Sequence, residues 1–258
     1  MRIECEVHIG TFSGDPYVWL GHPVGPNELE EVMDEHGIDM AIVMAPTEQY
    51  PDNKTLAESL IGHPRLLSFA VVNPYGPGGG VPELRRAVTE WGMKGVKLMP
   101  LRHGYEIDGS TALKVMEAAA VLEVPVSIHS GAQFCLPWQI ADLAKKFPTV
   151  PVIMDHMGWR YYVDGAINVA REVPNIYLET ALVAMPGYIR MAVDKIGADR
   201  VIYGSDYPTG HPASMIATIK AAKLIPADEA LVMGGNLERL LKLTAPGDSV
   251  SAKNKPSR

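Results

Sequence analysis

The sequence has few cysteines and no long apolar run. Its two cysteines, Cys5 and Cys135, are too few for a disulfide framework or a zinc knuckle, so we expect a protein of the reducing cytoplasm. No apolar run reaches the roughly 18 residues that a transmembrane helix needs, so we expect no membrane contact. The segment from Met1 to Glu4 carries no apolar signal region and leads directly into a predicted strand.

The chain also lacks an excess of positive charge. It contains 23 Lys and Arg against 30 Asp and Glu, a formal net charge of −7. A basic face for phosphate groups would have to form against this field, so nucleic acid is not an expected partner. With 258 residues, of which 47% are hydrophobic and 21% charged, the composition is that of a globular protein with a sizeable core.

Short apolar runs with strand character recur along the whole sequence. They lie 24 to 36 residues apart and begin near eight positions, which are Ile3, Asp39, Leu67, Gly95, Pro125, Pro151, Asn175 and Arg200. Each interval has room for one helix and two loops, and helix-sized crossovers imply parallel strands. Eight such units favour an α/β fold of the closed (β/α)8 TIM barrel type. No GxGxxG motif follows the first strand, which removes the main signature of an open, doubly wound sheet.

Residues typical of helix ends predict where the first helix begins and ends. Asn27 is the predicted N-cap of the first helix, with Glu30 as its capping-box partner, and Gly37 is its predicted end. We predict one barrel domain over residues 1–245. The small, polar and charged residues 246–258 predict a disordered tail.

Imidazole and carboxylate groups stand at several predicted strand ends, which line the active site of a barrel. Glu6 and His8 are two residues apart on the first strand, so their side chains share a face. His129, His156 and Asp206 end the predicted fifth, sixth and eighth strands. A catalytic divalent ion needs three or four nitrogen or oxygen ligands and an open position. The predicted ligands are Glu6, His8, His129 and Asp206.

Other polar residues are predicted near this mouth. Lys97 is expected to point inward on the fourth strand, either as a carbamate that bridges two metals or as an ion-paired lysine. Glu179, at the end of the seventh strand, could support His129 or His156, or could pair with a lysine. Trp19 in the long first loop could cap the pocket. Four rim residues could bind a substrate carboxylate or stack on an aromatic ring, or could be solvated loop residues: Arg102, His103, Arg160 and Tyr161.

The strand-end segments resemble those of the amidohydrolase superfamily. The segments are Ile128-His129-Ser130-Gly131, Asp155-His156-Met157-Gly158 and Tyr203-Gly204-Ser205-Asp206-Tyr207-Pro208. They are most similar to the amidohydrolase-related (amidohydrolase 2) branch, which includes aminocarboxymuconate-semialdehyde and γ-resorcylate decarboxylases. Gly95–Leu98 and Gly235–Leu241 fit the same branch, so the resemblance extends over about residues 3 to 243.

The resemblance implies a single-metal enzyme with a small-molecule substrate, in a branch whose barrels commonly form homodimers. Glu6, His8 and His129 match metal-ligand positions, and Asp206 matches the aspartate that binds the metal and shuttles a proton. His156 would lie beside the metal and polarise the substrate. Most of the family has His where this chain has Glu6, and Glu there resembles the γ-resorcylate-type decarboxylases. Those enzymes usually carry Glu at the position of Trp159.

One constellation of this kind could support two reactions. We expect first a metal-dependent hydrolase of a small ester, lactone or amide, in which a metal-activated water attacks the carbonyl group. The alternative is a metal-dependent, non-oxidative decarboxylase of an aromatic or unsaturated carboxylic acid. The third hypothesis is a catalytically inactive barrel that binds a small ligand. Zn²⁺ suits the histidines, and Mn²⁺ is the alternative because Glu6 adds a hard oxygen ligand.

Overall fold

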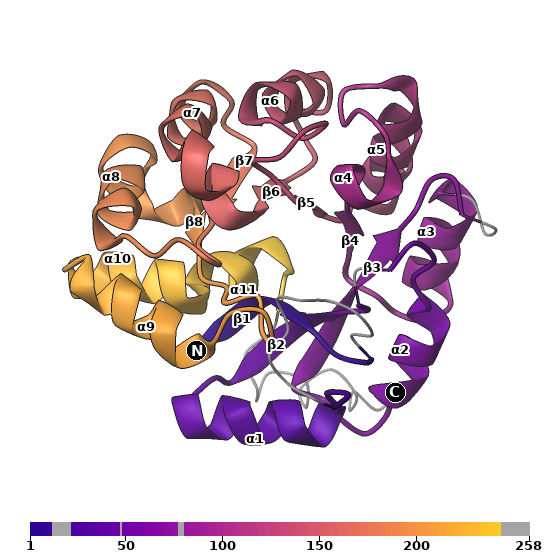
Figure 1. Cartoon of the computed structure of the whole chain (residues 1–258), viewed down its shortest axis with the longest axis horizontal. Coiled ribbons are helices and arrows are strands. Elements are labelled where there is room, and N and C mark those ends of the chain that lie inside the picture. The colour runs from indigo at the N-terminus through magenta and orange to yellow at the C-terminus, as the bar shows by residue number, and fades with distance from the viewer. Residues whose placement is uncertain (12–21, 47, 77–79, 244–258) are drawn as a thin grey trace, which may run out of the picture.

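Eight parallel strands form the centre of the computed structural model, which describes residues 1–11, 22–46, 48–76 and 80–243. Strand neighbours follow the order of the chain, as the predicted TIM barrel requires, and the barrel fold is confirmed (Figure 1). The strands are β1 (Ile3–His8), β2 (Met40–Met44), β3 (Leu66–Val72), β4 (Gly95–Leu98), β5 (Val126–Ile128), β6 (Val152–Met154), β7 (Ile176–Glu179) and β8 (Val201–Ile202). Trp19 and the predicted tail, residues 246–258, lie outside the described residues.

The barrel closes where the segment that follows β8 meets β1. The regular strand β8 covers only Val201–Ile202, whereas the sequence predicted a strand that continues to Asp206. The backbone beyond β8 still bonds to β1, because the Cys5 N–H donates to the Tyr203 carbonyl at 3.0 Å. The Asp206 N–H donates to the Glu6 carbonyl, also at 3.0 Å. This seam places two predicted site residues side by side.

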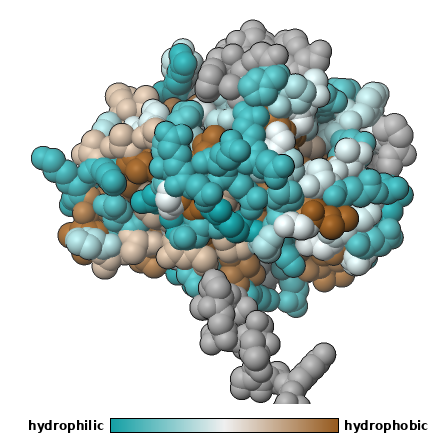
Figure 2. Space-filling view, turned by 90° about the horizontal axis from the view of Figure 1, so that it is seen from below, coloured by the Kyte–Doolittle hydropathy of each residue, from teal (hydrophilic) through white to brown (hydrophobic). Residues whose placement is uncertain are grey.

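Helices surround the strands, and the hydrophobic core lies between the two layers (Figure 1). The helices are α1 (Pro26–His36), α2 (Asn53–Ser59), α3 (Gly80–Thr89), α4 (Pro100–His103), α5 (Ser110–Leu122), α6 (Pro137–Lys146), α7 (Trp159–Glu172), α8 (Pro186–Ile196), α9 (Pro212–Ala221), α10 (Pro226–Ala230) and α11 (Asn236–Leu240), with the short turns η1 (Asp155–Gly158), η2 (Ala198–Arg200) and η3 (Leu231–Gly235). On the face seen in Figure 2, the outer side chains are mainly hydrophilic and the hydrophobic ones are scattered. Within the described ranges, no helix is long and apolar enough to cross a membrane.

Helix α1 begins before its predicted N-cap. Gly25 is the N-cap and Pro26 follows it, so Asn27 lies inside the first turn and that prediction is wrong. Proline suits this position because its φ is already helical and it has no N–H to leave unpaired. The predicted end at Gly37 is confirmed, with φ 62° in the left-handed region that glycine adopts without strain.

Asn175 ties the loops at the N-terminal end of the barrel, opposite the predicted site. It directly precedes β7, and its side-chain amide donates to three backbone carbonyls. These belong to Ala144 at 3.1 Å, Phe147 at 3.0 Å and Val150 at 2.9 Å. The contacts join the end of α6 to the start of β6.

Candidate functional site

The C-terminal strand ends bring together much of the predicted cluster. Glu6 and His8 both face the site, although the pairing of β1 with β2 is irregular between Glu4 and Val7. The Nε2 atom of His8 lies 3.6 Å from Oδ1 of Asp206 and 3.9 Å from Oε1 of Glu6. All three side chains are almost fully buried. Side chains about 200 positions apart in the sequence therefore lie side by side in the structure.

A backbone carbonyl orients the ring of His8. Its Nδ1–H donates to the carbonyl of Ala45, directly after β2, at 2.8 Å. In the neutral ring this leaves the lone pair on Nε2, the atom that faces Glu6 and Asp206. Histidines that bind metal ions are usually oriented by such a bond to their other ring nitrogen. The tautomer of His8 is therefore suited to a ligand role.

A buried ion-pair network joins this cluster to β4 and β6. Lys97 on β4 is fully buried, and its ammonium group pairs with Oε1 of Glu6 and Oδ2 of Asp155. The hydroxyl of Ser127 donates to both Asp155 oxygens, at 2.9 and 2.8 Å. Of the two roles considered for Lys97, the structure contains the ion-paired lysine. Its charge offsets part of the charge of two buried carboxylates.

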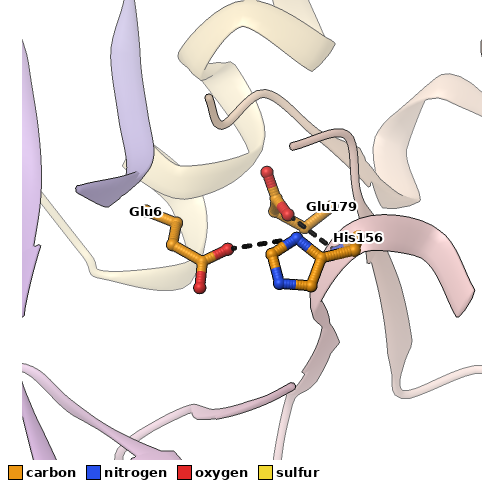
Figure 3. A group of neighbouring side chains, drawn as sticks. All are labelled: Glu6, His156 and Glu179. Atoms are coloured by element: carbon orange, nitrogen blue, oxygen red, sulfur yellow. Dashed lines mark hydrogen bonds and ion pairs between the residues drawn. The ribbon is translucent and has the colours of Figure 1, made fainter. Parts of the chain in front are cut away.

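The second oxygen of Glu6 faces His156. Figure 3 shows the carboxylate pointing toward the ring, with Oε2 at 3.8 Å from Nδ1. Both atoms are buried, and neither has a hydrogen-bond partner among the described residues. The other ring nitrogen, Nε2, lies 3.1 Å from Nδ1 of His129. Because buried polar atoms are normally paired, two such atoms face to face indicate a place where a polar group binds.

Glu179 contacts His156, as one of its two predicted roles requires, but it does so through the main chain. Its Oε2 atom accepts the His156 N–H at 3.0 Å, and Oε1 accepts the Ala181 N–H at 2.6 Å (Figure 3). The carboxylate thus fixes the path of the backbone rather than the ring. Glu179 is itself completely buried at the end of β7.

Burial and neighbouring charges separate the pKa values of the acids. Burial would raise the pKa of Glu6, but Lys97, His156 and His8 together outweigh it and hold this pKa well below its usual range. Burial, reinforced by the charge of Glu6, raises the pKa of Asp206 to about 6. Burial and the charges of Glu6 and Asp155 raise the pKa of Glu179 well above its usual value. Glu6 is therefore an anion, while Asp206 can gain or lose a proton near neutral pH.

The two histidines of the predicted ligand set respond in opposite ways. Burial lowers the pKa of His129 well below its usual value, and the charges of His156 and Lys97 act in the same direction. Burial would also lower the pKa of His8, but Glu6 and Asp206 outweigh it and raise this pKa. A neutral ring is the form that binds cations, so an arriving ion would have to displace a proton from His8 to solvent more often than from His129.

Two overlapping groups of side chains could hold a cation. One is Glu6, His8 and Asp206, and the other is Glu6, His156 and Glu179, with ligand atoms that lie within 4.8 Å of one another in each group. Glu6 belongs to both. Within the described part of the chain His129 belongs to neither group, and it reaches the cluster only through its contact with His156. Three of the four predicted ligands are thus close together. The ring of His156 separates the fourth, His129, from them.

The predicted substrate-binding residues lie at the rim with different exposure. Arg102, Arg160 and Tyr161 are exposed, and Tyr161 is 79% exposed. His103 is buried instead, and its Nε2–H donates to the backbone carbonyl of Glu48 at 3.0 Å. The ring of His103 therefore supports the segment that follows β2, and only its neighbour Arg102 is free to reach solvent.

Asp155 and Ser127 complete the site, and our sequence analysis did not identify them. Asp155 was assigned to the sixth strand, where alternation would turn it away from His156. The strand in fact ends at Met154, and a turn follows it, so both Asp155 and His156 face the interior. The available signal was an aspartate directly before a histidine at the end of an apolar run.

Residues 22–243 match the amidohydrolase family. This stretch is most of the chain. The chain belongs to the amidohydrolase family. The resemblance stated from the strand-end segments is thereby confirmed.

Several of the proteins that this chain resembles are decarboxylases. The chain is 24% identical over 283 residues to a gamma-resorcylate decarboxylase from Polaromonas sp. (strain JS666), covering 82% of this chain and 86% of that protein. A dihydroxybenzoic acid decarboxylase from Polaromonas sp. JS666, crystallised with manganese and 2-nitroresorcinol, superposes with a TM-score of 0.75 at 21% identity, covering 94% and 97% of the two chains. The 5-carboxyvanillate decarboxylase of Sphingomonas paucimobilis gives a TM-score of 0.73 at 17% identity, with 94% and 99% covered. At such identities the solved structures show the fold.

Replacing Lys97 by methionine should strongly destabilise the protein. Removal of one partner from a buried ion pair leaves the other charges uncompensated and typically costs about 3–5 kcal/mol. Urea unfolding of metal-free K97M and the parent should show a loss of this order. The control is K94M, because Lys94 is exposed one residue before β4 and should change the stability by no more than about 0.5 kcal/mol. Equal effects of the two substitutions would contradict the network.

Cation binding by the metal-free protein should weaken at low pH. Asp206, with its pKa raised to about 6, must be deprotonated to act as a ligand, so its proton competes with the ion below that pH. Affinity for Mn²⁺ should therefore fall at least tenfold per pH unit below pH 6, and more steeply still because His8, whose pKa is also raised, must lose its proton too. Calorimetry in buffers of different ionisation enthalpy counts the protons released at about pH 5. D206N should release about one proton fewer than the parent, and an unchanged count would exclude Asp206 as the titrating ligand.

Proposed function

We propose that this amidohydrolase-family protein is a divalent-metal-dependent, non-oxidative decarboxylase of an aromatic acid with a hydroxyl group beside its carboxylate. The observation that carries the proposal is Glu6, a buried carboxylate with one oxygen near His8 and the other near His156, in one cluster with Asp206. Glu at this place resembles the γ-resorcylate-type decarboxylases, and the relatives named above include such enzymes. Our first expectation, a hydrolase, has support only at the level of the family.

The hydrolase remains the second candidate because of one residue. Trp159 occupies the position where the γ-resorcylate-type decarboxylases usually carry Glu, so this chain has no carboxylate at that position. A hydrolase would use the same cluster to activate water and would act on an ester, lactone or amide. The two candidates therefore differ in substrate rather than in fold, and only turnover separates them.

The proposed ion is Mn²⁺ in preference to Zn²⁺. Glu6 and Asp206 provide two hard carboxylates, which suit manganese, and a related decarboxylase was crystallised with manganese. The unpartnered Glu6 oxygen and the lone pair of His8 fit an ion of this kind. Glu6, His8 and Asp206 would hold it, with His129 as the fourth ligand. When bound, a divalent ion supplies positive charge for the substrate's carboxylate and neighbouring oxygen.

Asp206 is the proposed proton donor. Its carboxyl proton passes to the ring carbon that bears the substrate carboxylate. The bond between this carbon and the carboxylate then breaks, the electron pair stays with the ring, and CO₂ leaves. Asp206 regains a proton from solvent. In the metal-free site, burial and the charge of Glu6 raise the pKa of Asp206 to about 6, so this carboxyl group holds a proton more readily than an ordinary aspartate.

His156 and the rim are proposed to hold the substrate. The unpartnered Nδ1 of His156 can donate a hydrogen bond to a substrate oxygen as negative charge develops on it. Arg102, Arg160 and Tyr161 are exposed at the rim, where a guanidinium group can bind a carboxylate and a phenol ring can stack on an aromatic substrate. His103 and Trp19 stay predicted substrate contacts, and a homodimer stays a predicted assembly.

A paired substrate screen tests the proposal. Protein reconstituted with Mn²⁺ is incubated with 2,6-dihydroxybenzoate and other hydroxybenzoates, and released CO₂ is measured. A parallel panel contains esters, lactones and amides. We expect CO₂ release that chelation abolishes and that E6A lacks. Metal-dependent turnover in the second panel alone would establish the hydrolase, and no turnover in either would support the inactive barrel.

Replacing His156 by asparagine should impair turnover without loss of the ion. Asparagine lacks the ring nitrogen that faces Glu6, so kcat should fall by roughly 10²-fold, the usual size for losing a group that stabilises developing charge. Metal content by elemental analysis should stay that of the parent. H63N is the control, because His63 pairs with Glu30 on the outside of the barrel at 2.8 Å. Loss of metal with normal turnover per bound ion would instead make His156 a ligand.

A further inference from the structure

The turn that carries His156 has an unusual backbone. Four consecutive residues have φ in the left-handed region: His156 (59°), Met157 (49°), Gly158 (80°) and Trp159 (55°). Only Gly158 is free of a Cβ atom, so the other three are strained, because the Cβ of an L-residue crowds the carbonyl in this conformation. Such a segment persists only where its surroundings hold it, and strain of this kind is typical of functional sites.

One hydroxyl group closes this turn at both ends. The Oγ–H of Ser130 donates to the carbonyl of Asp155, and the same oxygen accepts the N–H of Gly158 at 2.9 Å. Ser130 is fully buried and follows the end of β5. It therefore clamps the first and last residues of η1, one on each side of His156.

Two further contacts keep the turn in place. Glu179 accepts the N–H of His156 from the β7 side, as Figure 3 shows. Gly131 lies so close to the turn that a Cβ atom there would overlap the carbonyl of Gly158. The turn is thus pressed between the ends of β5 and β7. Of these contacts, the Ser130 hydroxyl is the one that can be removed with the smallest change in volume and charge.

We propose that Ser130 is a positioning residue for His156. Its hydroxyl holds the strained turn, and the turn holds the imidazole between Glu6 at 3.8 Å and His129 at 3.1 Å. The proposal rests on the proposed function, because it gives His156 a task in the decarboxylation. Without the clamp, the turn can relax toward ordinary backbone angles and carry the ring away from Glu6.

The test is a double-mutant cycle of S130A with H156N in the Mn²⁺-loaded protein. S130A alone should lower kcat about 10- to 100-fold, the effect expected when a group is misplaced by about 1 Å, and should leave KM and metal content unchanged. In the H156N background, S130A should change kcat by less than about twofold, because the group on which it acts is already gone. The fall in Tm caused by S130A should be the same in both backgrounds.

Two results would overturn the proposal. If S130A lowers kcat equally in both backgrounds, Ser130 does not act through His156. If S130A loses the ion, it acts on the neighbouring ligand His129. N175A is the control for a purely structural loss, because Asn175 makes three partly buried contacts with backbone carbonyls at the opposite end of the barrel. N175A should lower Tm while kcat stays that of the parent.

A spectroscopic measurement keeps this proposal separate from the proposed function. In zinc-loaded protein labelled with ¹⁵N-histidine, the ring nitrogens of His156 are assigned by comparison with H156N. S130A should shift these signals and N175A should not. If no decarboxylation is found in the parent, the function fails, but the shift still tests the clamp. Unchanged His156 signals in S130A would refute the clamp even in an active decarboxylase.

Discussion

The ammonium group of Lys97 determines how the acids of the site share their protons. Glu6 and Asp155 would be costly to bury as unpaired anions, and one lysine between them offsets that cost. Because Lys97, with His156 and His8, keeps Glu6 ionised, the charge of Glu6 adds to burial in raising the pKa of Asp206. Two carboxylates 200 positions apart in the chain thereby become a fixed anion and a proton carrier. Such a separation of pKa values is how one site performs both roles.

The same ion pair also organises the interior of the barrel. Lys97 extends from β4 to Glu6 on β1 and to Asp155 after β6, while Ser127 on β5 bonds to Asp155. Elements from opposite walls are therefore joined by one polar layer. Apolar side chains in this layer would fill the barrel equally well, but they would leave the ring of His156 and the carboxylate of Glu6 without a defined position.

The fold could be predicted because it depends on regular spacing. Eight apolar runs at helix-sized intervals allow few other topologies, and the barrel follows. Glu6 and His8 could be paired because a two-residue spacing survives even an irregular strand. The Lys97–Glu6 contact could not, since it joins residues 91 positions apart and depends on how strands tilt around the barrel. Asp155 was missed for a local reason, because the left-handed turn that follows it, made mostly of non-glycine residues, has no sequence signature.

The seam between β1 and the segment after β8 has a consequence for how the protein is made. Glu6 is made 200 residues before Asp206, so the backbone bond between them can form only after all eight strands have been made. Until then the early strands carry their acidic and imidazole groups without the partners that complete the cluster. A nascent chain can gather individual strand ends, but it has no complete cation site to offer. An ion bound across the seam would then join β1 to the segment after β8 and hold the barrel closed.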